Sequence, residues 1–549
     1  MRALSLPWLI GAAGVRVRSE PDRIRMRLNV LLPSHRSNVV GLLDLAVARD
    51  DLPEARRLLG LVSLDDPQQA SVHAAVELLA GEITAAEATA RGVLQTPTAG
   101  THGRAARARA HRVLRRARAL RDELGHTPGD GAPTVVTAGA PRADRQQRQL
   151  HGPLHGPVHG PLRVLHVVKN SLPYVHAGYT LRTHAILRTH RARGIDAQAI
   201  TRLGFPVVQG YLGARSDVID GVRYRRLLSA RGSDVQEYGR RLTGLARAQG
   251  VDVLHAATDH VNGQAAMIAA DALHLPLVYE VRGFLEDSWA CRHGGDDQAS
   301  STDRYRWSRE RETDVMLAAD AVITLSDTMA AEITSRGVPR DRIWIVPNGV
   351  DDTFLTEPRT QRVMQQALGL SPERVWVGAV TSLHSFEGLA TLLAAIERAR
   401  SAGRDVGAVI VGDGPARREL QASSPSDGSV RWIDRVAASS ARDWYDALDA
   451  VVVPRDDLRV TRLVTPLKPV EALARGRLVI ASDLPALREA TGGHARFVPP
   501  GDAEALAAEF DLIDEHRDLG RQGRAWVGEH RRWSQVCEGH LAAYASVVG

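Results

Sequence analysis

The chain of 549 residues has 70 basic side chains, and only two of them are lysines. One, Lys468, precedes Glu471 by three residues in "TPLKPVEALARG", so both side chains share the first turn of an expected helix. A lysine ammonium is a mobile point charge suited to phosphate, whereas arginine imposes a planar fork. Glu471 can cap the helix or accept hydrogen bonds from two neighbouring hydroxyls. The pair favours a site for phosphate and ribose; helix-dipole complementation by Glu471 and a surface position for Lys468 stay open.

The residues around this pair predict a strand, a loop and a short helix. "AVVVP" is typical of a strand, and the loop after it carries Arg455. Pro469 suits the first turn of a helix that ends at Gly476. Such a unit presents the free N–H groups and the positive end of a helix at a sheet edge, where anions bind. The sequence therefore predicts a sugar diphosphate with a ribose attached as the ligand.

Further candidates follow strands in the preceding half of the chain. The other lysine, Lys169, stands in "VVKNSLPYVHAGYTLRTH", where Gly178 can let the backbone approach a phosphate or merely start a helix. Arg282 follows the strand pattern in "VYEVRGFLEDSW". Arginine does not lose its proton in proteins, so Arg282 cannot be a base, but it can stabilise a leaving phosphate or fix an acceptor. Glu286 and Asp287 can orient Arg282 or an acceptor hydroxyl, or lie at the surface.

Glycine and cysteine usage adds weaker signals. In "GDGP", Gly412 and Gly414 follow a strand and can let a nucleotide base lie against the backbone. "PNGVD", residues 347–351, predicts a turn. The two cysteines cannot form a disulfide framework and lack paired zinc-ligand spacing, which favours a reducing compartment and no metal. His255, His260 and Cys291 are interpreted as core or loop residues.

The elements that must position these residues are short apolar strands alternating with helices. "LRVLHVV", "VDVLHAA", "LPLVYEV", "DAVITLS" and "DRIWIVP" form one series. "VWVGAVTSL", "GAVIVGDG", "VRWID", "DAVVVPR", "RLVIASD" and "ARFVPP" form a second. Strands separated by helices predict parallel sheets covered on both faces. Ligands of such sheets bind beyond the carboxyl ends of the strands, so we expect two doubly wound domains that face a cleft.

Ahead of this body, residues 1–125 predict a small all-α region. "LAVARDDLPEARRLLGLV" and "VELLAGEITAAEATARGVL" align at an offset of 31 residues, with turns at Asp50–Asp51 and Gly81–Glu82. They resemble tetratricopeptide hairpins, and a generic helical bundle is the alternative. Residues 126–162 end in "HGPLHGPVHGPL" and predict a flexible linker rather than a metal-binding segment. The two domains are expected over 163–352 and 353–549, with the last helix packing back on the first of them.

The net charge of +6 is unevenly distributed. Residues 1–162 contain 22 arginines against 15 acidic residues, and the remainder is nearly neutral. A basic helix is expected over 103–124; its face can be solvated, or can bind a protein partner or an anionic membrane surface. No nucleic-acid signature accompanies it. No apolar run is long enough to span a membrane, and the first residues lack a signal-peptide cleavage site, so we expect a cytoplasmic protein, peripheral at most to the inner face of the membrane.

Residues from about 163 to 549 resemble a retaining glycosyltransferase of family 4, with the GT-B fold. The resemblance rests on "HAGYTLRTHAILRTHRARGIDAQAITR", "HLPLVYEVRG", "ADAVITLSDTMAAEITSRGVPRDRIWIVPNGVD", "VIVGDGPARREL" and "PLKPVEALARGRLVIASDLPALRE". It implies a nucleoside-diphosphate sugar as donor, a carbohydrate or lipid-linked acceptor, and no metal or other cofactor. Polysaccharide or glycoconjugate synthesis for the cell envelope is the implied setting.

The resemblance also assigns roles residue by residue. The family has two glutamates with seven residues between them; Glu471 matches the second, and Leu463 stands at the first. A lysine usual near "FEGL" is replaced by Glu387, and both changes resemble a branch with the loop "TPLKP". The implied catalytic residues are Lys468, Arg282 and Arg455. The implied donor-binding residues are Glu471, Thr465, Gly178, Tyr179, Arg182, Gly412, Gly414 and Arg435. Lys169 and Glu286 are candidates for the acceptor side. Arg182 as a solvated helix residue is the alternative to its donor role.

No pair of carboxylates stands at glycosidase-like positions, so we expect front-face departure of the diphosphate rather than a two-carboxylate displacement. Two other functions stay open. A sugar-nucleotide epimerase of the same fold would need acid and base groups around the sugar and no acceptor. A non-catalytic scaffold would use the helical region as its functional module, with the transferase body degenerate at Leu463 and Glu387.

Overall fold

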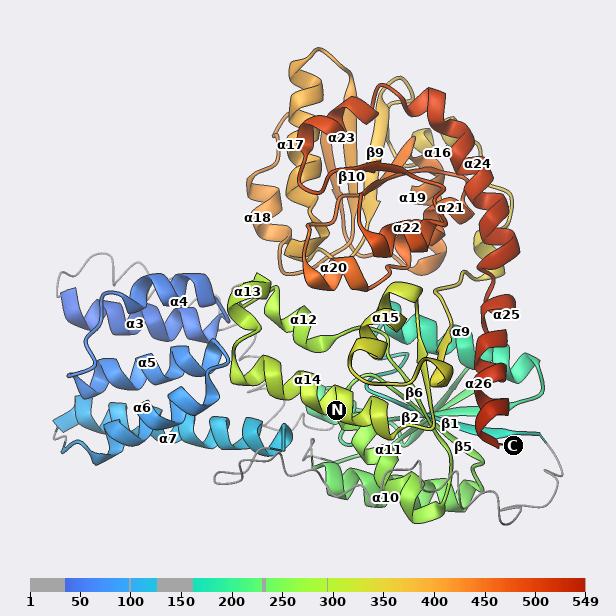
Figure 1. Cartoon of the computed structure of the whole chain (residues 1–549). Coiled ribbons are helices and arrows are strands. Elements are labelled where there is room, and N and C mark those ends of the chain that lie inside the picture. The colour runs from blue at the N-terminus through green and yellow to red at the C-terminus, as the bar shows by residue number, and fades with distance from the viewer. Residues whose placement is uncertain (1–34, 98–99, 126–160, 230–233, 294, 549) are drawn as a thin grey trace, which may run out of the picture.

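The computed structural model describes residues 35–97, 100–125, 161–229, 234–293 and 295–548. Figure 1 shows a helical region beside two stacked α/β domains. The first 34 residues and nearly all of the expected linker over 126–162 lie outside the described residues.

Among the described residues, the helical region contains five helices. They are α3 His35–Ala48, α4 Leu52–Leu59, α5 Pro67–Leu79, α6 Ile83–Gln95 and α7 Gly100–Glu123. Asp51 and Asp66 cap α4 and α5 by accepting hydrogen bonds from the free N–H groups of each first turn. The hairpins α3–α4 and α5–α6 turn at Asp50–Asp51 and Gly81–Glu82. An all-α region is thus confirmed, and its identity as tetratricopeptide repeats stays a prediction.

The basic helix α7 is only partly solvated. Arg109 lies inward, ion-paired with Asp44 of α3 and donating to Ser71 Oγ at 2.8 Å. Arg121 is buried and lies 3.1 Å from Glu87 of α6. The arginines of this helix therefore also bind the helical region together, besides forming an exposed face.

The helical region is docked on three helices of the first α/β domain, α12 Leu285–Ala290, α13 Gly295–Ala299 and α14 Asp303–Ala318. Asp303 Oδ2 accepts a hydrogen bond from the Thr84 backbone N–H at 2.8 Å. Arg311 donates to the carbonyls of Leu124 and Gly125 at 2.6 and 2.7 Å. Because these bonds involve backbone groups and buried side chains, they tie the region to the domain at both ends.

The first α/β domain, the N-terminal domain, contains an eight-stranded sheet in the order β3-β4-β2-β1-β5-β6-β7-β8. All neighbours are parallel except β3 and β4. Its strands are β1 Arg163–Val168, β2 Asp196–Thr201, β3 Ser216–Ile219, β4 Val222–Arg226, β5 Val253–Ala257, β6 Leu277–Glu280, β7 Ala321–Thr324 and β8 Ile343–Ile345. Its other helices are α9 Gly178–Ala192, α10 Val235–Gln249, α11 His260–Leu273 and α15 Asp327–Ser335. The strands β2, β3 and β4 are additions to the expected series.

The C-terminal domain contains six parallel strands in the order β11-β10-β9-β12-β13-β14. They are β9 Val375–Val380, β10 Val406–Val411, β11 Val430–Ile433, β12 Ala450–Val453, β13 Leu478–Ser482 and β14 Arg496–Val498. The helices are α16 Gln361–Ala367, α17 Leu389–Ser401, α18 Arg417–Ala422, α19 Ala438–Ala447, α20 Arg459–Leu463, α21 Lys468–Ala474, α22 Pro485–Thr491, α23 Ala503–Glu509 and α24 Ile513–His530. Apolar side chains from the strands enter two cores, one on each face of the sheet.

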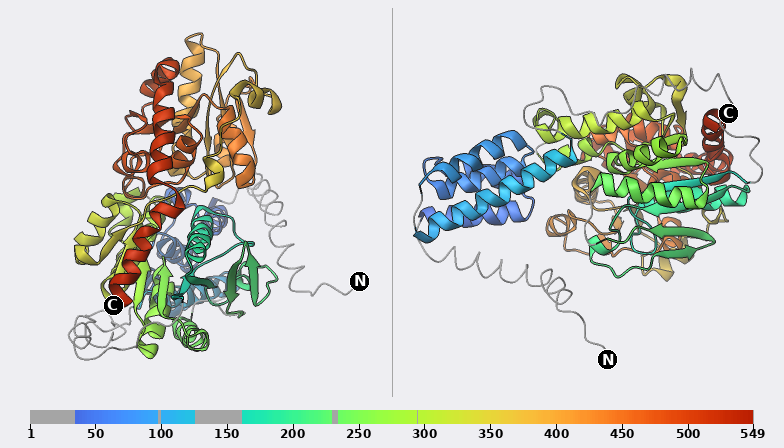
Figure 2. Two further views of the ribbon diagram at one scale, coloured as in Figure 1. Left: turned by 90° about the vertical axis from the view of Figure 1, so that its right-hand side faces the viewer. Right: turned by 90° about the horizontal axis from the view of Figure 1, so that it is seen from below.

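The chain then returns to the N-terminal domain through α25 Trp533–Val536 and α26 Glu538–Val548. Val350, on the outward crossing, pairs with Arg532 on the return. Trp533, Ala543 and Tyr544 are buried in the core of the N-terminal domain. The views of Figure 2 show α26 along that domain and the helical region to one side.

Two doubly wound domains preceded by an all-α region confirm the expected fold class. Among the described residues, no helix is both long and apolar enough to cross a membrane.

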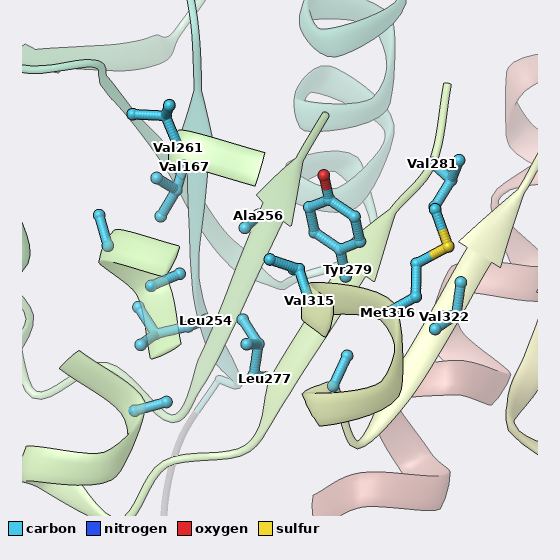
Figure 3. Close-up of a cluster of buried hydrophobic side chains, with 14 of the residues drawn as sticks. Val167, Leu254, Ala256, Val261, Leu277, Tyr279, Val281, Val315, Met316 and Val322 are labelled. Atoms are coloured by element: carbon cyan, nitrogen blue, oxygen red, sulfur yellow. The ribbon is translucent and has the colours of Figure 1, made fainter. Parts of the chain in front are cut away.

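A buried carboxyl group ties α14 to the sheet in the core of the N-terminal domain. Figure 3 shows Tyr279 of β6 among the apolar side chains of this core. Its hydroxyl donates to Glu312 Oε2 at 2.5 Å, and the His260 backbone N–H donates to Glu312 Oε1 at 2.6 Å. Burial raises the pKa of Glu312 to about 7.

This raised pKa gives a test of the core by pH. Glu312 binds its proton more tightly in the folded chain than in the unfolded one, so its contribution to stability is present below pH 4.5 and is lost as the pH rises through about 7. In the wild type, the unfolding free energy should fall as the pH rises from 5 to 7.5. We expect this fall to be about 2 kcal/mol smaller in Glu312→Gln, as measured by urea titration at each pH. The matched variant Glu310→Gln, exposed on the same helix, should keep the wild-type slope. An unchanged slope in Glu312→Gln would contradict this protonation.

Candidate active site

The carboxyl ends of β6 and β12 face each other where the two domains meet. Asn348 Nδ2, on the interdomain connection, donates to the Thr465 carbonyl at 3.0 Å. Gly283, after β6, packs against Val464, after α20. Leu463 and Val464 join the core of the N-terminal domain. Leu463, at the position of the family's first glutamate, is therefore an apolar interdomain contact.

An ion-pair cluster holds the same loop from the other side. Arg459, at the start of α20, lies 3.2 Å from Asp287 and 2.6 Å from Glu332, both of the N-terminal domain. Its backbone N–H donates to Asp296 Oδ2 at 2.6 Å. Burial and the neighbouring Glu286 raise the pKa of Asp287 to about 6. The loop that carries the candidate residues is thus held against α12, α13 and α15.

Lys468 and Glu471 lie together at the start of α21. Lys468 Nζ is 3.1 Å from Glu471 Oε2, and the buried Tyr445 hydroxyl donates to the same oxygen at 3.0 Å. Glu471 is buried, whereas the Lys468 side chain is one-third exposed, at 34%. The expectation that the two side chains hold opposite ends of one ligand therefore requires Lys468 to leave Glu471 when a phosphate arrives.

Arg455, after β12, pairs with Glu387, after β9. Arg455 Nη2 lies 2.8 Å from Glu387 Oε1, and Nη1 donates to the Val464 carbonyl at 3.1 Å. Both residues are buried. Glu387, which stands where the resemblance expects a lysine, thus forms a neutral ion pair with an arginine of the neighbouring loop.

Thr465 has a hydroxyl that is buried without a hydrogen-bond partner among the described residues. The side chain is 6% exposed, on the loop between α20 and α21. A buried hydroxyl is normally paired, so this one is suited to a ligand hydroxyl. Its position is consistent with its expected contact to the sugar.

The glycines of "GDGP" have a structural reason of their own. A side chain at Gly412 would clash with the Thr381 carbonyl, and one at Gly414 with Leu383, because the loops after β9 and β10 touch. A contact to a nucleotide base stays a prediction. Arg435 is exposed beyond β11.

On the N-terminal side, Glu280 at the end of β6 is the residue that sequence reasoning missed. Arg282 donates to Glu280 Oε2 from Nε at 2.8 Å, and Arg182 donates to Oε1 from Nε at 2.9 Å. Burial alone would raise the pKa of Glu280, but the two guanidinium groups hold it well below its ordinary value. The sequence feature that could have identified Glu280 is a glutamate near the end of the apolar strand "LPLVYEV".

The two arginines differ in the groups that they contact besides Glu280. Arg182 is 3% exposed, and its other N–H groups donate to the carbonyls of Val346 and Pro347 at 2.8 and 3.0 Å. The interpretation of Arg182 as a solvated helix residue is wrong, because it is buried inside the N-terminal domain. Arg282 also donates to the Tyr179 carbonyl at 3.0 Å and to Thr183 Oγ1 at 2.6 Å, which places it beside the start of α9.

The start of α9 is open to solvent. Gly178 and Tyr179 are exposed, and nothing lies within 4 Å of the position that a side chain would take at Gly178. The Tyr179 hydroxyl accepts a hydrogen bond from Asn170 Nδ2 at 2.8 Å. Lys169 lies 3.4 Å from Asp259. The Thr180 backbone N–H donates to the Ala177 carbonyl at 3.0 Å, so the N–H groups of Gly178 and Tyr179 are the ones in the first turn of this 15-residue helix that are available to an anion.

Glu286 and Asp287 are not surface residues. Glu286 is 1% exposed and lies 2.8 Å from Arg336; Asp287 accepts from the Tyr305 hydroxyl at 2.6 Å. The surface alternative for both is wrong, because each is a buried ion-pair partner. The predicted acceptor contact of Glu286 gains no support from this position.

Comparison with known proteins gives a consistent picture. A family model described as "Glycosyltransferase Family 4" matches residues 176–354, and one described as "Glycosyl transferases group 1" matches residues 372–513. The phosphatidyl-myo-inositol mannosyltransferase of Mycolicibacterium smegmatis is 31% identical over 168 residues, 30% of this chain and 42% of the relative. The enzyme of that name from Mycobacterium tuberculosis is 28% identical over 215 residues, 37% of this chain and 54% of the relative. The chain thus spans about half the length of these relatives.

Solved structures share the fold at low sequence identity. Sucrose-phosphate synthase from Thermosynechococcus elongatus superposes with a TM-score of 0.58 at 19% identity, covering 70% of this chain and 98% of that one. HepE of Anabaena in complex with UDP superposes with a TM-score of 0.54 at 16% identity, covering 70% and 100%. The family matches fall on the two sheet domains that build the site described above. The chain therefore has the GT-B fold, and each of its two sheet domains matches a glycosyltransferase family model.

Proposed function

We propose that this enzyme transfers a sugar from a nucleoside-diphosphate sugar to an acceptor hydroxyl with retention of the anomeric configuration. One observation carries the proposal: Lys468, Glu471 and the unpartnered Thr465 hydroxyl lie on one loop and helix after β12. That loop meets the loop of Arg282 from the other domain through Val464 and Gly283. The Lys468 ammonium can bind a phosphate, the Glu471 carboxylate can accept hydrogen bonds from a ribose, and the Thr465 hydroxyl can bond to the sugar.

In this proposal the donor lies between the two loops. Glu471 accepts the ribose hydroxyls, and Lys468 moves from Glu471 to the diphosphate. Thr465 binds the sugar, and the base lies near Gly412, Gly414 and Arg435. The diphosphate also approaches the open N–H groups of α9 at Gly178, opposite Lys468.

The reaction breaks the bond between the anomeric carbon and the diphosphate oxygen and forms a bond from that carbon to the acceptor oxygen. Lys468 and Arg455 stabilise the departing negative charge, and a diphosphate oxygen takes the acceptor proton. Glu280 is ionised and engaged by two arginines, so it is unsuited to donate a proton. This arrangement assigns the charge stabilisation to protein cations and does not require a metal.

The acceptor class is proposed from the relatives. Two are named phosphatidyl-myo-inositol mannosyltransferases, which favours a lipid-linked or polysaccharide acceptor of the cell envelope. The exposed part of the basic helix α7 fits an approach to an anionic membrane surface from the cytoplasmic side. Solved structures that share the fold contain UDP or ADP, so nucleotide sugars with several different bases should be tested as donors.

The reaction is tested by incubating the full chain with UDP-, ADP- and GDP-sugars, with and without a lipid extract of the cell envelope as acceptor. We expect one donor to be consumed faster with acceptor, and the product to keep the donor's anomeric configuration by proton NMR. Inversion would contradict the mechanism. Conversion of the donor without acceptor into an isomeric nucleotide sugar would support an epimerase instead.

Removal of the Lys468 ammonium tests the charge at the leaving group. Loss of one preorganised donor to a developing charge costs roughly 100-fold in turnover, so we expect that loss in Lys468→Ala, with a melting temperature close to that of the wild type. Lys468→Arg should recover part of the activity, and Arg418→Ala, which removes an exposed cation on α18, should have no effect. Full activity in Lys468→Ala would exclude the residue from the mechanism.

A methyl group at Gly178 tests the approach of the donor to α9. The position is sterically open, so Gly178→Ala should fold at least as stably as the wild type, because alanine favours helix. It should raise the KM for the donor about tenfold, equivalent to ~1.4 kcal/mol. Gly244→Ala, equally open on α10, should leave KM unchanged. An unchanged KM in Gly178→Ala would place the donor elsewhere.

A further inference from the structure

Beneath the sheet of the N-terminal domain, on the side of the C-terminal helix, lies a cluster of buried histidines. His190 belongs to α9, and His540 to α26, three residues after Cys537. All three side chains are fully buried. The rings of His190 and His540 lie edge to face with centroids 5.1 Å apart, and His255 of β5 is 5.5 Å from His540. None of these residues takes part in the proposed transfer.

The ring nitrogens of this cluster are largely unpartnered. Both nitrogens of His190 and both of His540 are buried without a hydrogen-bond partner among the described residues. Each buried polar atom left in this way costs about 1–3 kcal/mol, and such atoms in folded proteins are normally satisfied. Two neighbouring imidazoles with no hydrogen-bond partner among the described residues are therefore suited to bind a group that lies between them.

The spacing and chemistry of the side chains identify that group. One ligand atom each of His190, Cys537 and His540 lies within 4.8 Å of the others. Around tetrahedral zinc, with bonds of about 2.0–2.3 Å, ligand atoms are roughly 3.5 Å apart. The three ligand atoms would therefore have to move closer to one another by about 1 Å to bind the ion. Two imidazoles and a thiolate are the borderline-soft ligands that zinc prefers to calcium or magnesium.

We propose that His190, Cys537 and His540 bind one divalent cation of the zinc class, with water in the fourth position. His540 Nε2 lies 3.9 Å from Glu280 Oε1, which leaves Nδ1 for the cation. Glu280 then orients His540, as carboxylates commonly orient metal-binding histidines. The cation is structural: it joins α9 of the N-terminal domain to the last helix of the chain.

Metal analysis of the purified full chain tests the site. After expression with added zinc we expect about one zinc per chain, and less than a fifth of that in Cys537→Ser and in His540→Ala. Cys291→Ser is the matched control, because Cys291 is the other cysteine and lies outside the cluster; it should keep the zinc. Alanine at His151, His155 and His159 together should also keep it, which distinguishes the site from capture by the His-Gly-Pro repeats.

Two measurements on the folded wild type decide the question if the variants do not fold. Cobalt exchanged for zinc should show the visible bands of tetrahedral Co²⁺ and a near-ultraviolet thiolate charge-transfer band. A strong chelator should lower the melting temperature by at least about 3 °C, and added zinc should restore it. Absence of bound zinc together with no response to chelator or cobalt would overturn the proposal, as would full zinc retention in Cys537→Ser.

Discussion

The buried ion pairs of Glu280 with Arg282 and Arg182 are the constraint on which the arrangement of the site depends. A carboxylate with no exposed surface would be strongly destabilising alone, and removal of Glu280 would leave two largely buried guanidinium groups without this counter-ion. Arg282 connects Glu280 to the start of α9 through its hydrogen bonds to Tyr179 and Thr183. Arg182 connects Glu280 to the carbonyls of Val346 and Pro347, where the interdomain connection begins. From there Asn348 reaches the Thr465 carbonyl, so a chain of contacts connects Glu280 to the loop between α20 and α21 in the other domain.

The departures from the family pattern have physical explanations in the structure. Glu387 forms an ion pair with Arg455 from the neighbouring strand end, so the buried carboxylate has a counter-ion. Leu463 is partly buried and packs against the core of the N-terminal domain, so it serves as an apolar contact between the domains. Both positions therefore have a structural role in this chain.

The fold was predictable from sequence where the signal is local. Every strand of the two expected series is present, because buried parallel strands are continuous apolar runs separated by helices. The strands β2, β3 and β4 were missed. "SDVI" and "VRYRR" are short and polar and lie at the sheet edge or next to it, and "DAQAIT" has polar residues among its apolar ones. At the site, Lys468 and Glu471 were predictable because three residues separate them. The pairs of Glu280 with Arg182 and of Arg455 with Glu387 were not, since the partners lie 98 and 68 residues apart and a single sequence carries no trace of such pairing.

The paired crossings at Val350 and Arg532 determine how the two domains can move. The backbone N–H of Val350 donates to the Arg531 carbonyl at 2.7 Å, so the two connecting segments are joined side by side. Paired connecting segments restrain the two domains from sliding past one another at this edge. The ion pairs of Arg459, and the hydrogen bonds that the backbone N–H groups of Asp327 and Thr328 donate to Glu489, also cross between the domains. Any rotation of one domain away from the other about the paired segments would have to break these charged contacts.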